Sequence, residues 1–417
     1  MARHRVRALG GRGRSGGAPR ARRARDPLER AWTPHGTLAA DLHVHAHASS
    51  DSRLPNPQRV VAQVAAGIEV IALSDHNTNG DLDAEITGLG LDDVVASIAS
   101  NELSNDTMHL GVYPVRVDRD KPRGGSPSDQ VVSRATVPQL FELARGLGDR
   151  PILQVNHPRF RYTALFDSTR WNGVTWPPPF PLGFEAFEVL AGYSAANVPG
   201  DRRIDDSVRD LFTFVDHGHL VAPVGNSDTH DLNWVLDGTA RTYVFADAPR
   251  FDEASFIAAL RNRRVVATTG PWIDLEVAPH EGATPTVGPG QSVVASGSLW
   301  VDVTISQARF VRTERIRITT GSATGPMLAQ TIDVPTDIRS FHWAGRIALE
   351  STDTWVAVTA DGDTALPLEL TGTYQRDKWK RAGVTPYAVA SPILVDVDGD
   401  GWWKRGAANV SLRDAER

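Results

Sequence analysis

The chain has 417 residues, 41% of them apolar and 23% charged, a balance typical of a globular protein with a large buried core. It contains no cysteine, so disulfides, thiolate nucleophiles and cysteine-bound zinc are excluded, and any metal must be held by nitrogen and oxygen. The sequence as written shows no run of about 18 apolar residues and no signal-peptide pattern, which predicts neither a membrane span nor a secretory leader.

The net charge of −6 is unevenly distributed along the chain. Residues 1–25 hold nine arginines and no acidic residue, so the rest of the chain is more acidic than the whole. The Arg, Gly, Pro and Ala composition predicts a disordered arm over 1–36. An acidic body argues against binding nucleic acid over a broad surface, and we expect a small-molecule partner instead. A cytoplasmic location fits the sequence as written, whereas export would require residues upstream of Met1.

Between 37 and 272, apolar strand-like runs alternate with amphipathic helical ones. The predicted strands are Leu38–Val44, Glu69–Leu73, Val94–Ser100, Pro151–Val155, Phe184–Leu190, Leu220–Val224 and Ala240–Phe245. The predicted helices are Gln58–Ala66, Val137–Leu147, Ile204–Asp216 and Asp252–Arg261. Strand–helix repetition of this kind predicts parallel strands covered by helices, as in an α/β barrel. Long loops over 116–135 and 160–181 interrupt the series, and loops of this length often cover active sites.

The pattern changes after Pro271 to short β segments separated by Gly, Pro and Asp turns. Ser298–Ser306 alternates between apolar and polar residues, which is typical of a strand with one buried face. These segments predict a small antiparallel β-sandwich over 273–373, followed by a C-terminal extension over 374–417. The extension includes the acidic turn Asp396-Val397-Asp398-Gly399-Asp400-Gly401.

Residue types that bind metals occur in small packets, most of which close a predicted strand. The packets are Asp41-Leu42-His43-Val44-His45, Ser74-Asp75-His76-Asn77, Asn101-Glu102-Leu103, His109, Asn156-His157-Pro158 and Ser227-Asp228-Thr229-His230. Each packet alone is weak, since an Asp can cap a helix and His-Pro can be an ordinary turn. Together they would meet at one rim of a parallel sheet, where α/β barrels carry their active sites. Imidazole and carboxylate ligands without thiolate suit zinc, manganese or iron.

The packets resemble the motifs of the polymerase-and-histidinol-phosphatase (PHP) superfamily of metallohydrolases. The stretches Asp41–Asp51, Ser74–Gly80 and Gly225–His230 look like its carbaryl-hydrolase-like branch, in which a β-sandwich often follows the barrel. The resemblance covers about 37–272 strongly and the rest loosely. It implies a distorted (β/α)7 barrel that binds two or three divalent metal ions.

The resemblance also implies ligand roles at matching positions. The first metal would be held by His43, His45, Glu102 and Asp228. Glu102 would bridge to a second metal, together with His109 and His157. Asp51, His76 and His230 would hold a third, although Asp51 stands where several relatives have histidine. Asp228, His230 and Glu102 are the expected catalytic residues.

These expectations point to a hydrolase in which a hydroxide between two metals attacks a small phosphoester or a carboxyl or carbamate ester. Arg159 and Arg161 follow the His-Pro turn and are candidates for binding a phosphate or carboxylate, with solvated loop arginines as the alternative. Two other classes stay open. The barrel could be a non-catalytic metal-binding scaffold beside a ligand-binding sandwich, or the chain could be a nuclease of the PHP type.

Other residues near the motifs have weaker assignments. Asp75 is expected to orient a neighbouring imidazole, or else to cap a helix. Glu188 lies near the same rim but matches no ligand position. Asp396, Asp398 and Asp400 predict a possible calcium turn, although an EF-hand would need a carboxylate where Ala407 stands.

Overall fold

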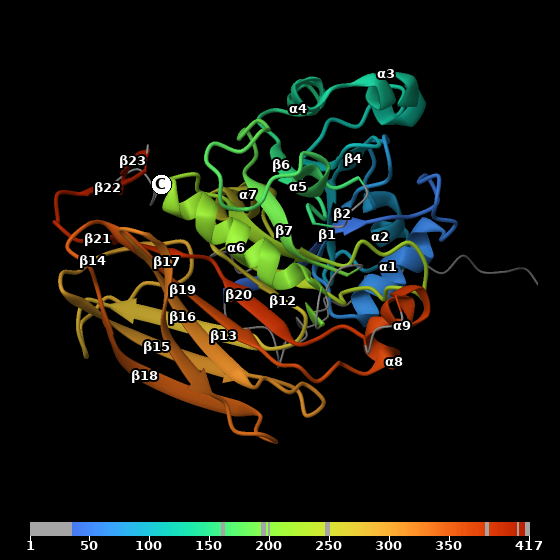
Figure 1. Cartoon of the computed structure of the whole chain (residues 1–417). Helices are drawn as coiled ribbons and strands as arrows, with labels where there is room; N and C mark the ends of the chain where they lie inside the picture. Colours follow the sequence, from blue (N-terminus) through green and yellow to red (C-terminus); the bar gives the residue numbers. More distant parts are fainter. Residues whose placement is uncertain are drawn as a thin grey trace, which may run out of the picture. The chain divides into compact units, whose positions relative to one another are not determined.

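The computed structural model describes residues 36–159, 163–192, 197–198, 201–246, 251–379, 383–406 and 408–412. The arm predicted over 1–36, apart from Gly36, and the predicted anion-binding residue Arg161 lie outside these ranges. Residues Thr33–Arg417 form one compact unit. It is mixed α/β with more strand than helix, 35% against 20%, and its strands and helices are labelled in Figure 1.

The first three strands are adjacent and parallel in one sheet, in the order β1, β2, β3. Their bounds are Thr37–Val44, Val70–Leu73 and Ala96–Ala99. Helix α1 (Asn56–Ala65) connects the first two strands and α2 (Asp83–Leu89) the next two. A helical crossover returns the chain to the same end of the sheet, so this segment has the predicted parallel arrangement.

A second sheet has the order β10, β7, β6, β5, β4. The bounds of these strands are Ala222–Asn226, Ala186–Ala191, Ile152–Val155, His109–Tyr113 and Asn101–Ser104. Strands β6, β7 and β10 are parallel, as predicted. Strands β4 and β5 were not predicted from the sequence, and β5 pairs antiparallel with both β4 and β6. The link at 105–108 is too short for a crossover, so β5 folds back on β4 as a hairpin.

The four helices predicted from amphipathic periodicity are present, with ends that shift by one or two residues. They are α1, α4 (Val137–Arg145), α6 (Arg203–Asp216) and α7 (Glu253–Arg261). The Thr136 and Gln139 side chains form a capping box that fixes the start of α4. The predicted loop 116–135 contains the short elements η1 (Pro122–Gly125) and α3 (Asp129–Arg134). Helix α5 (Leu165–Ser168) lies within the second predicted loop.

These two sheets stay open, so strand pairing does not close the barrel expected from the sequence. They approach each other through single bridges, between Val44 and Thr229 and between His76 and Glu102. A cluster of buried apolar residues joins β1, β2 and β3 to β6, β7 and β10. Val44 ends β1, Thr229 follows β10 and His76 follows β2, whereas Glu102 lies near the start of β4. The two bridges place the predicted ligand packets at one rim.

The chain from β13 onward forms two sheets packed face to face. Strands β13 (Trp272–Ala278), β15 (Ser298–Ser306) and β18 (Ser340–Ala348) form an antiparallel sheet, and β15 has the predicted bounds. The facing layer contains β16 (Arg315–Ser322), β17 (Gly325–Asp333) and β19 (Thr354–Asp361). Side chains such as Leu299 and Val303 of one sheet and Ile316 and Val356 of the other share one buried cluster.

The facing layer is continuous with the first sheet of the chain. Strand β20 (Tyr387–Ala390) pairs with β19 on one side and with β12 (Val265–Thr268) on the other. Strand β12 pairs with β11 (Arg241–Phe245), which pairs with β1. Both pairings are antiparallel, so the predicted parallel arrangement was wrong for this strand. Strands β21 (Ile393–Asp396) and β14 (Ser292–Val294) extend the far edge. The predicted extension 374–417 thus supplies strands that join the two halves, and the boundaries at 272 and 373 stay predictions.

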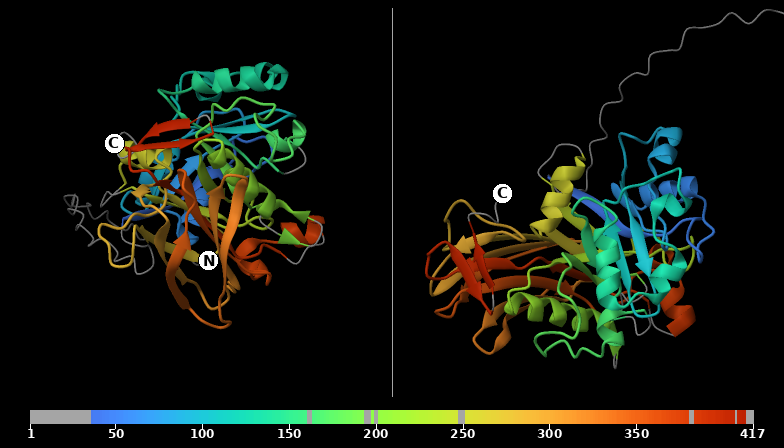
Figure 2. Two further views of the ribbon diagram at one scale, coloured as in Figure 1. Left: turned by 60° about the vertical axis from the view of Figure 1, so that its left-hand side comes forward. Right: turned by 90° about the horizontal axis from the view of Figure 1, so that it is seen from above.

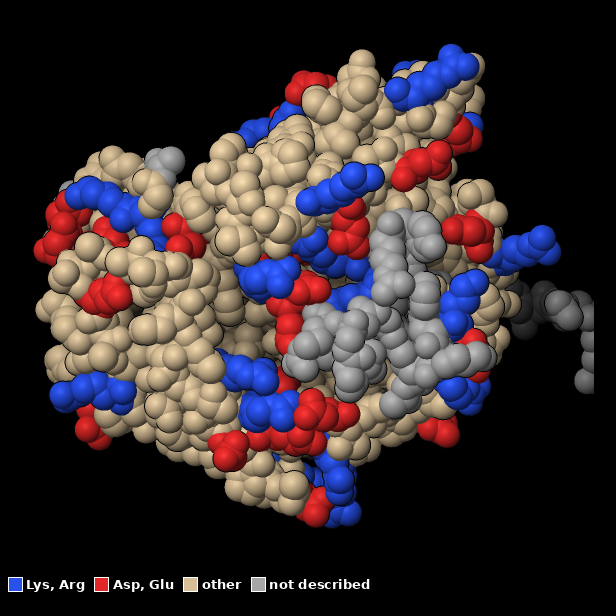
Figure 3. Space-filling model, in the orientation of Figure 1, with Lys and Arg blue, Asp and Glu red and all other residues tan. Residues whose placement is uncertain are grey.

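The views in Figure 2 show the orange strands of the β15–β18 region on one side and the blue and cyan strands on the other. On the face in Figure 3, Lys and Arg side chains are interspersed with Asp and Glu side chains over the described residues. Among the described residues, no helix combines the length and hydropathy that a bilayer crossing requires.

Candidate metal centre

The predicted ligands lie in or directly after six strands, which bring them to one rim. His43 is in β1 and His45 directly follows it, while His76 follows β2. Glu102 is in β4 and His109 begins β5. The remaining ligands, His157, Asp228 and His230, come after β6 and β10. Sequence spacing predicted this convergence, and the structure brings all of these residues together.

Glu102 is the centre of the cluster. Its carboxylate is fully buried and has five imidazoles around it. The oxygen-to-nitrogen distances are 2.7 Å to His76, 2.9 Å to His43, 3.2 Å to His109, 3.6 Å to His157 and 3.7 Å to His45. Burial alone would raise the pKa of Glu102, but the surrounding imidazoles hold it well below its usual range.

Asp228 approaches the same cluster from the opposite sheet edge. Its Oδ1 lies 3.2 Å from Nε2 of His43 and 3.2 Å from Nε2 of His45. The two imidazole nitrogens are themselves 3.1 Å apart. Donor atoms bound to one zinc ion at about 2.1 Å are separated by about 3.0 to 3.4 Å, so these spacings fit a shared cation.

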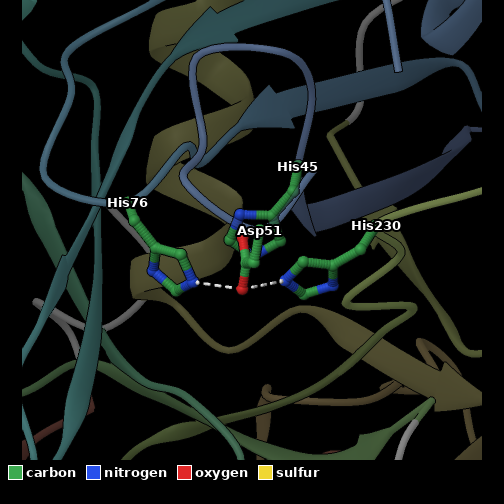
Figure 4. Close-up of side chains that lie close together, drawn as sticks. All are labelled: His45, Asp51, His76 and His230. Carbon is green, nitrogen blue, oxygen red and sulfur yellow. Dashed lines mark hydrogen bonds and ion pairs between the residues drawn. The ribbon is translucent and has the colours of Figure 1, made fainter. Parts of the chain in front are cut away.

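Asp51 connects two further histidines at the more exposed side of the rim. Its Oδ2 lies 3.1 Å from Nε2 of His76 and 3.1 Å from Nε2 of His230, and Figure 4 shows it between them with His45 close by. The Asp51 side chain is 50% exposed, whereas His76 and His230 are 14% and 15% exposed. The carboxylate therefore stands where solvent or a ligand can reach an ion.

The close donor atoms fall into overlapping groups in which all atoms lie within 4.8 Å of one another. The groups are His43, His45 and Glu102; His43, His157 and Asp228; His76, Glu102 and His109; and His45, Asp51, His76 and His230. Because the groups overlap, they could hold adjacent ions that share ligands. Nitrogen and oxygen donors are compatible with zinc, manganese or iron, and the donor set does not choose among them.

The hydrogen bonds of His43 show why the cluster needs positive charge. Its Nδ1 lies 2.8 Å from Oε1 of Glu188, so Nδ1 carries the hydrogen and donates it to that carboxylate. The opposite atom, Nε2, faces Glu102 and Asp228, which are also acceptors. In a neutral imidazole with its hydrogen on Nδ1, the Nε2 lone pair would face the lone pairs of these carboxylate oxygens, and the two would repel. Either a proton or a metal ion at this point removes the repulsion, and the arrangement therefore fits a metal ligand.

The pKa values of His43 in β1 and of His45, which directly follows it, are shifted in opposite directions. Burial lowers the pKa of His43, but the charges of Asp228 and Glu102 outweigh burial and hold its pKa well above the usual value. Burial also lowers the pKa of His45, and the neighbouring His230 lowers it further, so its pKa is well below the usual value. The pKa values of these two neighbouring imidazoles are therefore shifted in opposite directions.

Glu188 is the residue whose role the sequence pattern did not assign. It is fully buried in β7, where Oε1 also accepts a hydrogen bond from Nδ2 of Asn226 (2.9 Å), and Oε2 accepts one from the backbone N–H of His157 (2.6 Å). It therefore fixes His43 and the His157 turn together. An acidic residue buried in an apolar strand needs a hydrogen-bond or ion-pair partner. The position of Glu188 within the apolar run Phe184–Leu190 is therefore the sequence signal that could have identified its role.

Other polar residues brace the rim without facing it directly. Asn156 donates from Nδ2 to Glu102 at 2.8 Å, and Ser49 Oγ lies 3.0 Å from Nδ1 of His45. Asp41 accepts hydrogen bonds from both the backbone N–H and the hydroxyl of Ser227, which ties β1 to the end of β10. Such supporting contacts orient ligands and tune metal affinity.

Asp75 does not orient an imidazole as expected. Its Oδ1 accepts a hydrogen bond of 2.7 Å from the backbone N–H of Ala46, and so it fixes the chain just after His45. The backbone at the rim is also unusual, because Asn77, His157 and Asp228 have φ values of 51°, 29° and 54°. Residues other than glycine rarely adopt positive φ, and such conformations concentrate at functional sites.

Arg159 has a different role from the predicted one. Its Nε and Nη2 donate to the two carboxylate oxygens of Asp210 at 2.7 and 2.8 Å, and Nη1 donates to the backbone oxygen of Trp171 at 2.8 Å. The guanidinium also lies over the rings of Phe166 and Trp171. Its donors are therefore engaged in holding α6 against the 165–171 segment, which leaves the anion-binding assignment without a geometric basis.

The acidic turn that follows β21 also brings carboxylates together, but not the set expected for calcium. The close group is Asp353, Asp396 and Asp398, whereas Asp400 forms an ion pair with Lys404. Both oxygens of Asp396 accept backbone hydrogen bonds, from Gly399 at 2.7 Å and Gly401 at 2.9 Å. The carboxylate therefore braces the turn, and calcium binding stays a prediction.

A scan against models of known protein families finds no match to this chain, and a search of curated proteins finds none either. The assignment to the PHP superfamily thus stays a proposal, carried by the motifs and the geometry of the rim.

Proposed function

We propose that this chain is a metal-dependent hydrolase of small phosphoesters or of carboxyl or carbamate esters, built on a distorted (β/α)7 barrel of the PHP type. The observation that carries the proposal is one buried carboxylate, Glu102, within 3.7 Å of five imidazoles. The first ion would be held by His43, His45, Glu102 and Asp228. The second would be held by Glu102, His109 and His157, and the third by Asp51, His76 and His230.

Bound divalent ions would supply Lewis-acid activation of water and of the ester oxygen. The protein's own contribution is to preorganise the donors. Glu188 keeps the hydrogen of His43 on Nδ1 and so directs the Nε2 lone pair to the rim. Asn156 and Ser104 donate hydrogen bonds to opposite oxygens of Glu102, at 2.8 and 3.1 Å, and fix the orientation of the carboxylate.

Partial exposure favours catalysis over a purely structural metal site. His76, His109 and His230 are 14–16% exposed and line a cavity of about 490 Å³. Structural metal sites are closed by protein ligands, whereas catalytic sites keep a position for substrate. The partial exposure of these histidines therefore also argues against a non-catalytic metal-binding scaffold. Nothing at the rim favours the nuclease alternative.

The deciding experiment measures metal content and turnover on the same preparations. Protein loaded with Mn, Zn or Fe is assayed with p-nitrophenyl phosphate, bis-p-nitrophenyl phosphate, p-nitrophenyl acetate and a naphthyl carbamate. We expect two to three ions per chain and turnover of at least one ester. Asp228→Asn should abolish that turnover with an unchanged circular dichroism spectrum.

A matched control removes a carboxylate from an exposed His–Asp pair elsewhere. Asp302 lies 2.9 Å from His342 in the three-stranded sheet, and Asp302→Asn should leave turnover and metal content unchanged. Fewer than one ion per chain in the wild type would refute the metal centre. Full occupancy without turnover of any ester would instead favour the scaffold.

A further inference from the structure

The cavity beside the metal rim has a second wall that belongs to no ligand packet. Six of its described lining residues belong to the rim: Asp51, His76, His109, His157, Asp228 and His230. The facing wall includes Asp231 and Trp234 from the loop after β10, and Tyr374 and Lys378 from α9 (Tyr374–Trp379). Helix α9, which follows the sandwich strands in the sequence, therefore contributes to the wall of this cavity.

Backbone contacts hold this segment against the loop that follows β10. Helix α8 (Leu368–Thr371) precedes α9, and both lie at the end of the molecule that holds α1 (Figure 1). The N–H of Tyr374 donates to the carbonyl of Trp234 at 2.9 Å, and the N–H of Thr373 donates to that of Asn233 at 3.1 Å. Gly372 has φ of 84°, and a Cβ there would lie 2.2 Å from the Trp234 carbonyl oxygen. Close approach therefore requires glycine at this position.

The wall combines an aromatic surface with a cation. The rings of Trp234 and Tyr374 have centroids 5.8 Å apart, and Trp234 is 49% exposed although it is a large apolar side chain. Lys378 is exposed and has no carboxylate within ion-pair distance among the described residues. The nearby Asp231 uses Oδ1 to accept the backbone N–H groups of Asn233 and Trp234 at 2.6 and 2.8 Å. An exposed indole beside an ammonium group suits a flat ring that carries negative charge.

We propose that α9 and the loop after β10 form a recognition wall, in which Trp234, Tyr374 and Lys378 select substrates whose aromatic ring bears an anionic group away from the bond that is cleaved. The inference rests on the proposed hydrolase function for its reaction. Recognition by the wall can be measured without turnover.

The first test measures binding of two probes to zinc-loaded protein by calorimetry. The probes are 4-hydroxybenzenesulfonate and phenol, chosen because a sulfonate is a poor metal ligand. The wild type should bind the sulfonate about tenfold more tightly than phenol, as expected for one charge-assisted contact. Lys378→Met should remove that preference, and Trp234→Ala should weaken both probes about tenfold.

Matched controls come from the same chain. Lys121→Met replaces an exposed lysine paired with Asp118, and Trp402→Ala replaces an indole that is 42% exposed outside the cavity lining. Both should bind the probes as the wild type does. Metal content and circular dichroism of every variant separate lost recognition from lost folding.

The second test compares turnover of phenyl phosphate with 4-sulfophenyl phosphate, and of phenyl acetate with 4-sulfophenyl acetate. Lys378→Met should lower kcat/KM for the sulfonated ester of the active pair only. Equal binding of the two probes by the wild type, or unchanged binding in both cavity variants, would overturn the recognition wall. A wild type that prefers the sulfonate yet cleaves no ester would leave the wall standing and remove the hydrolase proposal.

Discussion

Two clusters in this chain bring metal-ligating side chains close together but differ in what their carboxylate oxygens face. At the rim, Glu102 is surrounded by imidazole nitrogens, and the Nε2 of His43 faces acceptors on two sides. In the turn after β21, the oxygens of Asp353 and Asp396 each accept a backbone N–H. In both clusters, at least three metal-ligating atoms lie within 4.8 Å of one another, so proximity alone does not show which cluster is a metal site.

The groups that face the carboxylate oxygens distinguish a metal site from a cluster that only stabilises the local backbone. A carboxylate whose lone pairs are satisfied by amide hydrogens gains little from a cation and fixes the local backbone. A cluster in which lone pairs face one another is stable only with added positive charge. On this criterion the rim requires added positive charge, from protons or from metal ions, and the turn does not. The following predictions test this contrast.

The largest effect is expected at the centre of the rim. Glu102→Ala removes the one carboxylate that faces five imidazoles, so at least two ions should be lost together with all turnover. Elemental analysis of the purified variant, with the Asp302→Asn protein beside it, measures this loss. Retention of every ion would contradict the bridging role of Glu102.

Chelation should destabilise the wild type strongly. Ions that bind only the folded state stabilise it by about 4 kcal/mol per site when their free concentration is a thousand times the Kd. Removing them with a chelator should lower the melting temperature of the wild type by more than that of Glu102→Ala, which has already lost at least two ions. Equal melting curves of wild type with and without chelator would mean that the rim holds no ion.

Loss of a supporting carboxylate should have a smaller effect. Glu188→Gln keeps the size of the side chain but replaces one acceptor oxygen with an NH₂ group, so His43 loses its fixed orientation. Metal affinity should fall by about 10- to 100-fold with the fold intact, measured by competition with a chromogenic chelator. Unchanged affinity would show that Glu188 only fills space. Glu185→Gln is the matched control, because Glu185 is three positions away in sequence and accepts a hydrogen bond from the backbone N–H of Leu153.

The turn should respond in stability alone. Asp396→Asn places an amide NH₂ where a carboxylate oxygen accepts a backbone N–H, and it should cost about 1–3 kcal/mol of unfolding free energy. Denaturant unfolding measures the cost, while metal content and turnover should match those of the wild type. Loss of an ion from this variant would instead make the turn a metal site.

Local pattern was enough to predict much of the fold. Periodicity identified four helices and gave the bounds of Ser298–Ser306, because amphipathicity is visible within a few residues. It missed the β4–β5 hairpin, where ligand residues replace the usual apolar alternation. It also gave no sign that β20 would pair with β12, since that contact joins segments more than a hundred residues apart.

The site shows the same division. The residue types in the packets and their position at strand ends predicted which side chains would converge. The role of Glu188 depends on a contact 145 positions from His43, and that of Asp75 depends on the path of the backbone after β1. Arg159 had a plausible position next to the His-Pro turn, but the buried acid Asp210 on α6 engages its guanidinium.

By itself, the sequence determined the kinds of donor available at the rim, the exclusion of thiolate chemistry and the order in which strands supply the donors. Only the tertiary structure decided which oxygen faces which nitrogen, and which segment lines the opposite wall of the cavity. The physical reason is that hydrogen-bond geometry and charge pairing depend on sheet register and helix docking, and these are set by long-range packing rather than by local sequence.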